Sequence, residues 1–267
     1  MTHDVVKGHA YGNDFLLAPL DDLQANPAAI ARAMCDRHQG IGADGLIFYT
    51  LGPASATMRL FNADGSPSEL SGNGVRCLGA LVARRQHLQP GQLIAIDTDA
   101  GRKRLELQAI EAGRFVFRTS LGAPSDVRQM ELTAAGETVI ASVLGMGNPQ
   151  CVLLGALPDP ERFHRLGRAL ATHAAFPAGT NVEFAHIVAP NRIEILIWER
   201  GVGPTTSSGT GTAAAAVAAA AHGGASRDAQ VVAPGGTQRV EWLDDGVYLT
   251  GWAELVLDGH WIRGSNR

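Results

Sequence analysis

Two short glycine turns at matching places in the two halves of the chain constrain its fold more than any other feature. Ser71–Gly74 precedes an Ala/Leu/Val-rich helical pattern and Ser208–Gly211 precedes a second one, with the two serines 137 positions apart (208 − 71). A second pair has nearly the same offset, because Gly12 and Gly147 lie 135 positions apart (147 − 12) and each is followed by Asn. Two matches at one offset predict a duplicated unit of about half the chain.

Each serine–glycine turn has the features of an anion-binding helix start. The serine offers a hydroxyl, the glycines let a ligand approach the main chain, and the first N–H groups of a helix have no partner within it. A single turn of this kind is more often an ordinary helix cap. The duplication favours binding, and two facing copies would hold one small anionic substrate from both sides.

The composition is that of a globular protein with room for two cores. A chain of 267 residues, 45% apolar and 18% charged, suits two domains of roughly 130 residues each. A net charge of −4 without a Lys/Arg cluster argues against nucleic-acid binding. We find no secretory signal and no apolar run near the ~20 residues of a membrane helix. Three scattered cysteines form no disulfide or zinc pattern, and we predict a cytoplasmic protein without a metal.

Strand-like alternation dominates the chain, and helical patterns are few. Helices are predicted at Pro27–Arg37, Val75–Arg85, Pro160–Thr172 and Thr212–Gly223. Strands are predicted at Asp4–Lys7, Phe15–Ala18, Leu46–Tyr49, Thr57–Phe61, Leu93–Asp97, Lys103–Ala109, Arg114–Thr119, Val139–Leu144, Cys151–Leu154, Val182–Val188, Arg192–Trp198, Arg239–Trp242, Val247–Thr250 and Ala253–Leu257. This proportion is too rich in strands for a doubly wound sheet. We therefore predict an α+β fold of two halves, each a curled sheet around one central helix.

The boundary between the halves is expected near Phe117–Pro124, where a strand runs into Leu121–Pro124. We accordingly assign residues 1–118 to the N-terminal half and residues 119–252 to the C-terminal half.

Glu199 and Arg200 form the most suggestive charged pair. They end an apolar strand pattern, Ile195–Trp198, seven residues before the second glycine turn. Adjacent opposite charges at a half-buried rim could supply a general base, Glu199, and a carboxylate clamp, Arg200. The alternative interpretation is a surface ion pair.

Three asparagines are candidate ligands for a zwitterionic substrate. Asn13, Asn148 and Asn181 each lie in a loop beside a predicted strand. Any one of them alone is more often a turn residue, but together they could donate amide hydrogen bonds.

Taken together, these segments resemble the diaminopimelate epimerase family. The matching segments occur in family order over nearly the whole chain: Tyr11–Phe15, Gly40–Gly45, Arg59–Gly65, Ser71–Cys77, Gly147–Pro149, Thr180–Phe184, Glu199–Gly203 and Gly209–Gly211. The resemblance implies two pseudo-symmetric halves, each a β-roll or barrel around a central helix. It also implies that the last strand, about Ala253 to Ile262, returns to the first half, so that residues 253–267 complete it.

The function implied by the resemblance is a cofactor-independent epimerase of lysine biosynthesis, which interconverts LL- and meso-diaminopimelate. An acid and a base act on opposite faces of the substrate Cα, and helix N-termini hold the α-carboxylate. The implied partner is a small amino-acid substrate, with neither nucleic acid nor membrane. Members of the family often form homodimers.

The implied catalytic positions are Ser71, Ser208, Glu199 and Gln150. The implied substrate ligands, besides Glu199, are Asn13, Asn62, Gly72, Asn73, Asn148, Asn181, Arg200, Gly209 and Thr210. The family has cysteines where this chain has Ser71 and Ser208, and a histidine where it has Gln150. Cys77 and Cys151 fall at non-catalytic positions of the family pattern.

These replacements leave three readings of the chemistry open. A serine hydroxyl is a far weaker acid than a thiol and needs an adjacent base; Glu199 is such a base for Ser208, whereas Gln150 is neutral. The chain could be a serine-containing diaminopimelate epimerase, which we adopt as the prediction. It could instead be a related isomerase or one-base enzyme acting on another small carboxylate, or a catalytically silent amino-acid-binding homologue.

Overall fold

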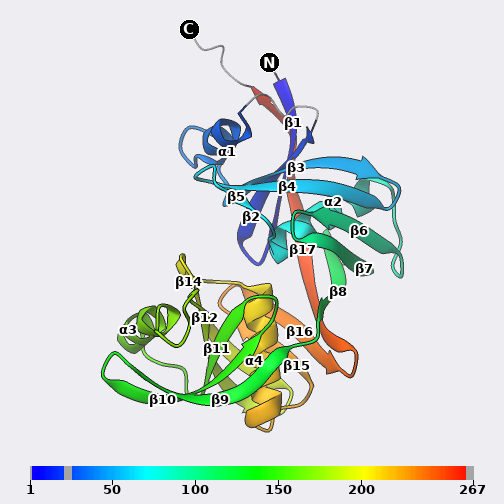
Figure 1. The fold of residues 1–267 in the computed structure, drawn as a ribbon. Coiled ribbons are helices and arrows are strands. Elements are labelled where there is room, and N and C mark those ends of the chain that lie inside the picture. The colour runs from blue at the N-terminus through cyan, green and yellow to red at the C-terminus, as the bar shows by residue number, and fades with distance from the viewer. Residues whose placement is uncertain (1, 21–25, 263–267) are drawn as a thin grey trace. The chain divides into compact units, whose positions relative to one another are not determined.

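The computed structural model describes residues 2–20 and 26–262 (Figure 1). The chain forms two compact units: Met1–Thr119 with Trp252–Arg267 is unit 1, and Ser120–Gly251 is unit 2. Each of these limits lies one residue from the division expected from the sequence. Among the described residues, no helix is long and apolar enough to cross a membrane.

Unit 1 is a closed ring of strands around one helix. Its elements are β1 (Thr2–Ala10), β2 (Asn13–Pro19), α1 (Pro27–Cys35), β3 (Gly45–Gly52), β4 (Ser55–Asn62), β5 (Pro67–Ser68), α2 (Gly72–Arg85), β6 (Leu93–Thr98), β7 (Gly101–Glu111) and β8 (Arg114–Gly122). The ring runs β1–β2–β3–β4–β6–β7–β8 and closes through β17 (Gly246–Ile262), which pairs with both β8 and β1. The β2–β3 and β4–β6 pairs are parallel, and α1 and α2 lie on the connections between them.

Unit 2 repeats this element order. After β9 (Ser125–Ala134) come β10 (Glu137–Gly145), β11 (Pro149–Leu154), α3 (Pro160–Ala171), β12 (Asn181–Ala189), β13 (Arg192–Glu199), β14 (Gly203–Thr205), α4 (Gly209–His222), β15 (Asp228–Ala233), β16 (Gly236–Leu243) and the start of β17. The parallel pairs β11–β12 and β13–β15 match those of unit 1. The duplication expected from the glycine turns is therefore present in the topology.

The central helices are buried on every side. In α2, the eleven residues Asn73–Ala83 are all buried, and they pack inside the ring against the apolar side chains of its strands. In α4, Gly211–Ala219 are buried in the same way. Alanine is a strong helix former and its small side chain lets the surrounding strands come close, which explains the run Ala213–Ala216 at the centre of unit 2.

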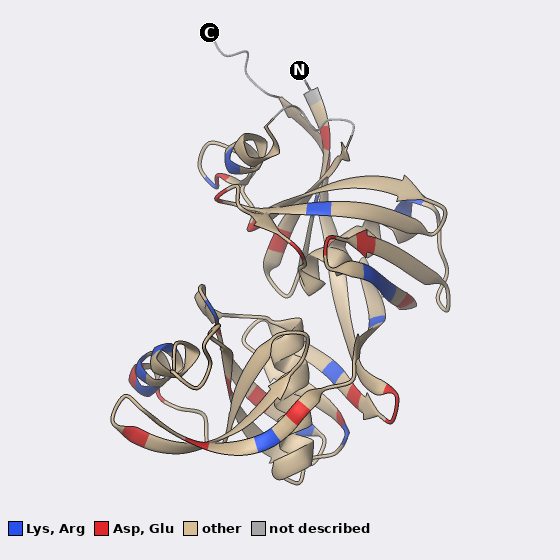
Figure 2. Cartoon of the chain, viewed as in Figure 1, with Lys and Arg blue, Asp and Glu red and all other residues tan. Residues whose placement is uncertain are grey.

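The other two helices cover the outer faces of the sheets. Helix α1 buries one stripe, Ile30, Ala31, Met34 and Cys35, and α3 buries Phe163, Leu166, Gly167, Leu170 and Ala171. Figure 2 shows the contrast in charge between the helices of unit 2: α3 carries Arg and Glu, whereas α4 has no Asp, Glu, Lys or Arg. An outer helix such as α3 has one face in solvent and is therefore amphipathic, whereas an inner helix such as α4 is buried and therefore uncharged.

Several boundaries differ from the sequence prediction for local reasons. Helices α2 and α4 begin at Gly72 and Gly209, three residues before the predicted starts, because a serine cap draws the glycines into the first turn. Helix α1 ends at Cys35 and leaves Arg37 free to bind carboxylates. Strand β9 was not predicted, because most of its side chains are exposed and lack an apolar alternation. The short strand β15 was also missed, and the last two predicted strands are one continuous strand, β17.

Candidate active site

The start of α2 holds Ser71 as its cap. Ser71 has extended backbone angles (φ −133°, ψ 121°), and its Oγ accepts a hydrogen bond from the Gly74 N–H at 3.1 Å. Gly72 and Asn73 are the first two residues of the helix, and N–H groups at these positions have no intrahelical acceptor. The predicted ligands Gly72 and Asn73 therefore present backbone donors beside the Ser71 hydroxyl.

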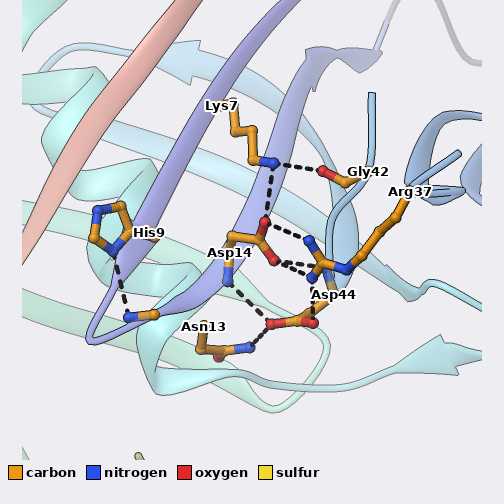
Figure 3. A network of polar contacts seen from close by, with 8 residues as sticks. Lys7, His9, Asn13, Asp14, Arg37, Gly42 and Asp44 are labelled. Carbon is orange, nitrogen blue, oxygen red and sulfur yellow. Dashed lines mark hydrogen bonds and ion pairs between the residues drawn. The ribbon is translucent and has the colours of Figure 1, made fainter. Parts of the chain in front are cut away.

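The amides of Asn13 and Asn73 are oriented by one chain of hydrogen bonds in unit 1. Asn73 Nδ2 donates to Asn13 Oδ1 at 3.1 Å, while the buried Arg76 guanidinium donates to Asn73 Oδ1. Asn13 Nδ2 donates in turn to Asp44 Oδ2 at 2.7 Å (Figure 3). The oxygen and the NH2 group of each amide both have a hydrogen-bond partner. The two side chains are therefore preorganised before any ligand arrives.

Asp44 belongs to a charged network that the sequence analysis did not assign to the site. Arg37 donates to Asp14 (2.7 and 3.1 Å) and to Asp44 (2.8 Å), and Lys7 forms an ion pair with Asp14 at 3.0 Å (Figure 3). Burial raises the pKa of Asp14, but the hydrogen bonds from Arg37 and Lys7 outweigh it and lower that pKa to about 2. The network holds the acceptor of Asn13 in place. Asp14 and Asp44 could have been found from the matched segments that contain them.

Asn62 is the last residue of β4 and lies on the surface. Its Nδ2 donates to Ser66 Oγ at 2.9 Å, and Ser66 also donates to Asp64. In this structure the Asn62 amide holds the turn between β4 and β5, as expected for an Asn in an Asn–Ala–Asp–Gly segment.

The start of α4 repeats the serine cap and adds a carboxyl group. Ser208 (φ −141°, ψ 127°) is buried, and its Oγ accepts from the Gly211 N–H at 3.3 Å. Glu199 is the last residue of β13. Burial raises the pKa of Glu199, and a hydrogen bond with the Ser208 side chain opposes that rise. A hydroxyl hydrogen-bonded to a carboxylate of raised pKa is a pair suited to accept and return a proton.

Arg200 turns away from its neighbour Glu199. Its guanidinium donates to the Ala178 carbonyl at 2.7 Å, and its backbone N–H donates to Asn181 Oδ1 at 2.9 Å. The two adjacent charges thus take different partners, Glu199 with Ser208 and Arg200 with the loop before β12. Gly209 and Thr210 follow as the first two residues of α4, the places that Gly72 and Asn73 take in α2.

Gln150 lies in unit 2 against a glutamate that the sequence analysis left without a role. Gln150 is the second residue of β11 and is 1% exposed; Glu183, the third residue of β12, is 0% exposed. One terminal atom of the Gln150 amide lies 3.0 and 3.3 Å from the two Glu183 oxygens, and the other lies 2.6 Å from Asn148 Oδ1 and 3.2 Å from Asn181 Nδ2. The structure therefore joins Asn148, Gln150 and Asn181 to Glu183.

A pocket of about 420 Å³ opens beside this group in unit 2. Asn148 and Gln150 line it together with Ser125, Asp126, Arg128, Val143, Leu144, Gly145, Gly147, Pro149 and Phe176. Arg128 is a cationic lining residue that sequence reasoning did not select.

The cysteines are buried thiols. Burial raises the pKa of Cys77 to about 12 and raises that of Cys151 still further, with the charge of Glu183 adding to the effect. A thiol with such a pKa is almost wholly protonated at neutral pH, so neither side chain supplies a thiolate base. Within the described ranges, no group of three or more His, Cys, Asp or Glu side chains is placed to hold a metal ion.

Comparison with known proteins identifies the family. The family model for diaminopimelate epimerase matches residues 5–124 and 142–256. A diaminopimelate epimerase of Desulforudis audaxviator is 40% identical over 280 aligned positions, covering 97% of this chain and 99% of the relative. The chloroplastic diaminopimelate epimerase of Oryza sativa subsp. japonica is 36% identical over 95% of this chain and 78% of its own length.

Solved structures agree on the fold. A predicted epimerase from Pseudomonas aeruginosa superposes with a TM-score of 0.75 at 14% identity, covering 98% of this chain and 100% of the other. A hydroxyproline epimerase from Agrobacterium vitis gives 0.65 at 15% identity, covering 97% and 90%. The sequence matches extend through the glycine turns, the asparagines and Glu199–Arg200. The chain belongs to the diaminopimelate epimerase family.

Proposed function

We propose that this chain is a cofactor-independent epimerase that interconverts LL- and meso-diaminopimelate by proton transfer at Cα. The hydrogen bond between Ser208 and Glu199 at the start of α4 is the observation that carries the proposal. It provides the serine with the adjacent base that a hydroxyl needs in order to act on a carbon acid. Family membership and the preorganised asparagines support the choice of an amino-acid substrate.

Inversion at Cα needs one proton removed and another delivered to the opposite face. In the proposed reaction, Ser208 Oγ takes the Cα proton while its own proton passes to Glu199, and the Cα–H electron pair stays on the substrate. Ser71 delivers a proton from its hydroxyl to the other face and recovers one from water. In the reverse direction, Ser71 passes its own proton to water as it removes the Cα proton, and Ser208 returns one with Glu199 as its source.

The developing carbanion is stabilised through the substrate carboxylate. Backbone N–H groups of Gly72 and Asn73 in α2, and of Gly209 and Thr210 in α4, are the proposed donors. A helix N-terminus carries about half a positive charge, and fixed donors of this kind strengthen as negative charge forms on the carboxylate. Asn13, Asn62, Asn148, Asn181 and Arg200 are the proposed partners of the remaining polar groups.

The proposal also covers the cellular location and the oligomeric state of the enzyme. We place the enzyme in the cytoplasm, which suits three buried free cysteines, Cys35, Cys77 and Cys151, because thiols stay reduced there. We also propose a homodimer, which light scattering of the purified chain tests through its molar mass.

Proton NMR of the full chain with LL-diaminopimelate in D2O tests the function. We expect loss of the Cα proton signal together with appearance of the meso form. The double variant Ser71→Ala/Ser208→Ala is the matched control, because it keeps both helices and removes both hydroxyls. Deuterium uptake without inversion would overturn the proposal in favour of a one-base reaction, and no uptake by the wild-type chain would remove the catalytic function altogether.

A further inference from the structure

Glu183 is a buried carboxyl group that the proposed reaction does not use. Its side chain is 0% exposed and points under the first turn of α4, since a Cβ on Gly211 would lie 2.5 Å from Glu183 Oε1. The Gln150 amide, 1% exposed, is its direct polar neighbour at 3.0 and 3.3 Å. An acid enclosed in this way must either keep its proton or be matched by a donor.

The Gln150 amide can meet Glu183 in two ways at the same atomic positions. With Nε2 toward Asn148, it donates to Asn148 Oδ1 at 2.6 Å and turns its carbonyl oxygen to Glu183, which must then donate a proton. With Nε2 toward Glu183, it donates to the ionised carboxylate. Its carbonyl oxygen then accepts from Asn181 Nδ2 at 3.2 Å and lies 2.6 Å from the Asn148 amide, which has to turn its NH2 group toward Gln150. Each orientation satisfies a different protonation state of Glu183.

The surroundings make this choice exclusive. The Asn181 amide is held by the Arg200 N–H on its Oδ1, so its Nδ2 always faces Gln150 and cannot become an acceptor. Asn148 is half-buried and can turn. Gln150 therefore either donates to Asn148 Oδ1 or accepts from Asn181 and from a turned Asn148, and the carboxyl of Glu183 is the neighbour whose hydrogen-bonding capacity changes with pH.

We propose that Glu183 is a positioning residue whose proton decides which way the Gln150 amide points, and thereby whether Asn148 turns its Oδ1 or its NH2 group toward Gln150. In the protonated state, Asn148 Oδ1 is bound to Gln150 and its NH2 group is directed away as a donor for a substrate carboxylate. In the ionised state the Asn148 NH2 group donates to the Gln150 carbonyl oxygen instead, and the substrate loses that donor. The consequence for substrate rests on the proposed function, whereas the amide orientation does not.

The electrostatic surroundings favour the protonated state of Glu183. Burial, and then the negative charge of Glu199 on β13, raise the pKa of Glu183 well above its usual value. On β11 the titratable neighbour is Cys151, whose own pKa is raised by burial and by Glu183. The first turn of α4 contributes no acidic side chain. Burial and the negative charge of Glu199 therefore disfavour a negative charge on Glu183 beneath α4.

Side-chain amide spectra of the ¹⁵N-labelled full chain test the orientation directly. We expect the Gln150 NH2 signals, assigned by their loss in Gln150→Met, to move in one step as pH rises above the usual glutamate range, as one titrating carboxyl of raised pKa would produce. In Glu183→Gln they should stay at the low-pH position, because the new amide donates to Gln150 as the protonated acid does. Glu194→Gln, which changes an exposed glutamate of β13, should titrate like the wild type.

Three results would overturn the proposal: no movement in the wild type, movement that survives in Glu183→Gln, or loss of the step in Glu199→Gln. The last would assign the step to Glu199, whereas a step that moves to lower pH in Glu199→Gln supports Glu183, because a neighbouring negative charge has been removed. These spectra need no turnover, so they separate this inference from a failure of the proposed function.

Kinetics test the positioning role. We expect Glu183→Leu to raise KM for diaminopimelate roughly tenfold, the effect of one lost hydrogen bond, with a smaller change in kcat. Glu183→Gln should restore KM at neutral pH to within about threefold of the wild type. A fall in kcat with unchanged KM in Glu183→Leu, or failure of the Gln variant to rescue KM, would contradict a role through Asn148.

Discussion

Glu183 in unit 2 and Ile47 in unit 1 occupy equivalent places beneath the starts of their central helices. Each is the third residue of its strand, β12 or β3. A Cβ on Gly211 would lie 2.5 Å from Glu183 Oε1, and a Cβ on Gly74 would lie 2.9 Å from Ile47 Cδ1. The duplicated fold thus places an apolar side chain in one unit and an acid in the other, so the two helix starts have different chemistry on the same backbone.

The first prediction concerns the close contact at Gly211. Gly211→Ala should destabilise unit 2 by about 1–3 kcal/mol, because the added methyl group forces Glu183 or the helix to move. Gly72→Ala is the control: nothing lies within 4 Å of its Cβ position, and the change should be neutral or stabilising by less than about 1 kcal/mol. Urea unfolding measures both. Equal effects would show that the Glu183 contact is not tight.

The second prediction separates the two serines. Glu199→Gln should lower Cα deuterium exchange by about 10²-fold or more, because Ser208 loses its base. Ser71→Ala should abolish inversion and still allow exchange of the isomer whose proton Ser208 removes. NMR in D2O measures both quantities, with Glu194→Gln as the control for an exposed glutamate on the same strand. Equal loss of exchange in both variants would contradict the separate roles.

The third prediction follows from the raised pKa of Glu183. The folded chain keeps this proton at pH values where the unfolded chain has lost it, so stability falls as pH rises from the usual glutamate value toward the raised one. Glu183→Gln removes that dependence. The free energy of unfolding of the variant, relative to the wild type, should therefore increase as pH rises above the usual glutamate range. A difference that stays constant with pH would mean that Glu183 has an ordinary pKa.

The fourth prediction concerns the network of Figure 3. The pKa of Asp14 is lowered from 3.8 to about 2, so its stabilisation is present above about pH 4 and is lost as pH falls through about 2. Asp14→Asn should cost about 2 kcal/mol at neutral pH and flatten the acid limb of the stability profile. Asp97→Asn, which breaks the exposed ion pair with Arg102, should cost much less than Asp14→Asn, because solvent screens an exposed pair. A similar loss in the two variants would argue against the network.

The fifth prediction restores the residues of the family pattern. Ser71→Cys/Ser208→Cys/Gln150→His should raise the epimerisation rate by orders of magnitude, because a thiol titrates near pH 8.5 and a serine hydroxyl far above it. Initial rates with LL-diaminopimelate, measured on the wild type and the triple variant, provide the comparison. A triple variant that folds and binds but shows no gain would mean that the pocket no longer fits diaminopimelate.

Local patterns in the sequence were sufficient for the repeated architecture. The offset between the two glycine turns predicted the duplication, and apolar periodicity located the four helices of residues 2–20 and 26–262. The errors of the sequence prediction were also local. It missed β9, whose side chains are mostly exposed. It also began α2 and α4 at Val75 and Thr212, because apolar periodicity gives little weight to glycines in a capped first turn.

The sequence predicted only some of the residues that form the candidate site. Matched segments selected Ser208, Glu199 and the asparagines, because those residues are contiguous with recognisable turns. Asp44 and Glu183 also lie within matched segments, but the sequence of those segments did not indicate their roles. What these two side chains do depends on which strand or helix start lies opposite.

By itself, the sequence determined the duplicated α+β fold, the family and the residues that cap the two central helices, since each depends on short-range spacing or on similarity along the chain. Only the tertiary structure decided that Gln150 contacts Glu183 and that Asn13 is held by Asp44. Those pairs come from different strands and loops. Their burial, charge and hydrogen bonds arise when the parallel pairing of β2 with β3 and of β11 with β12 brings the segments together.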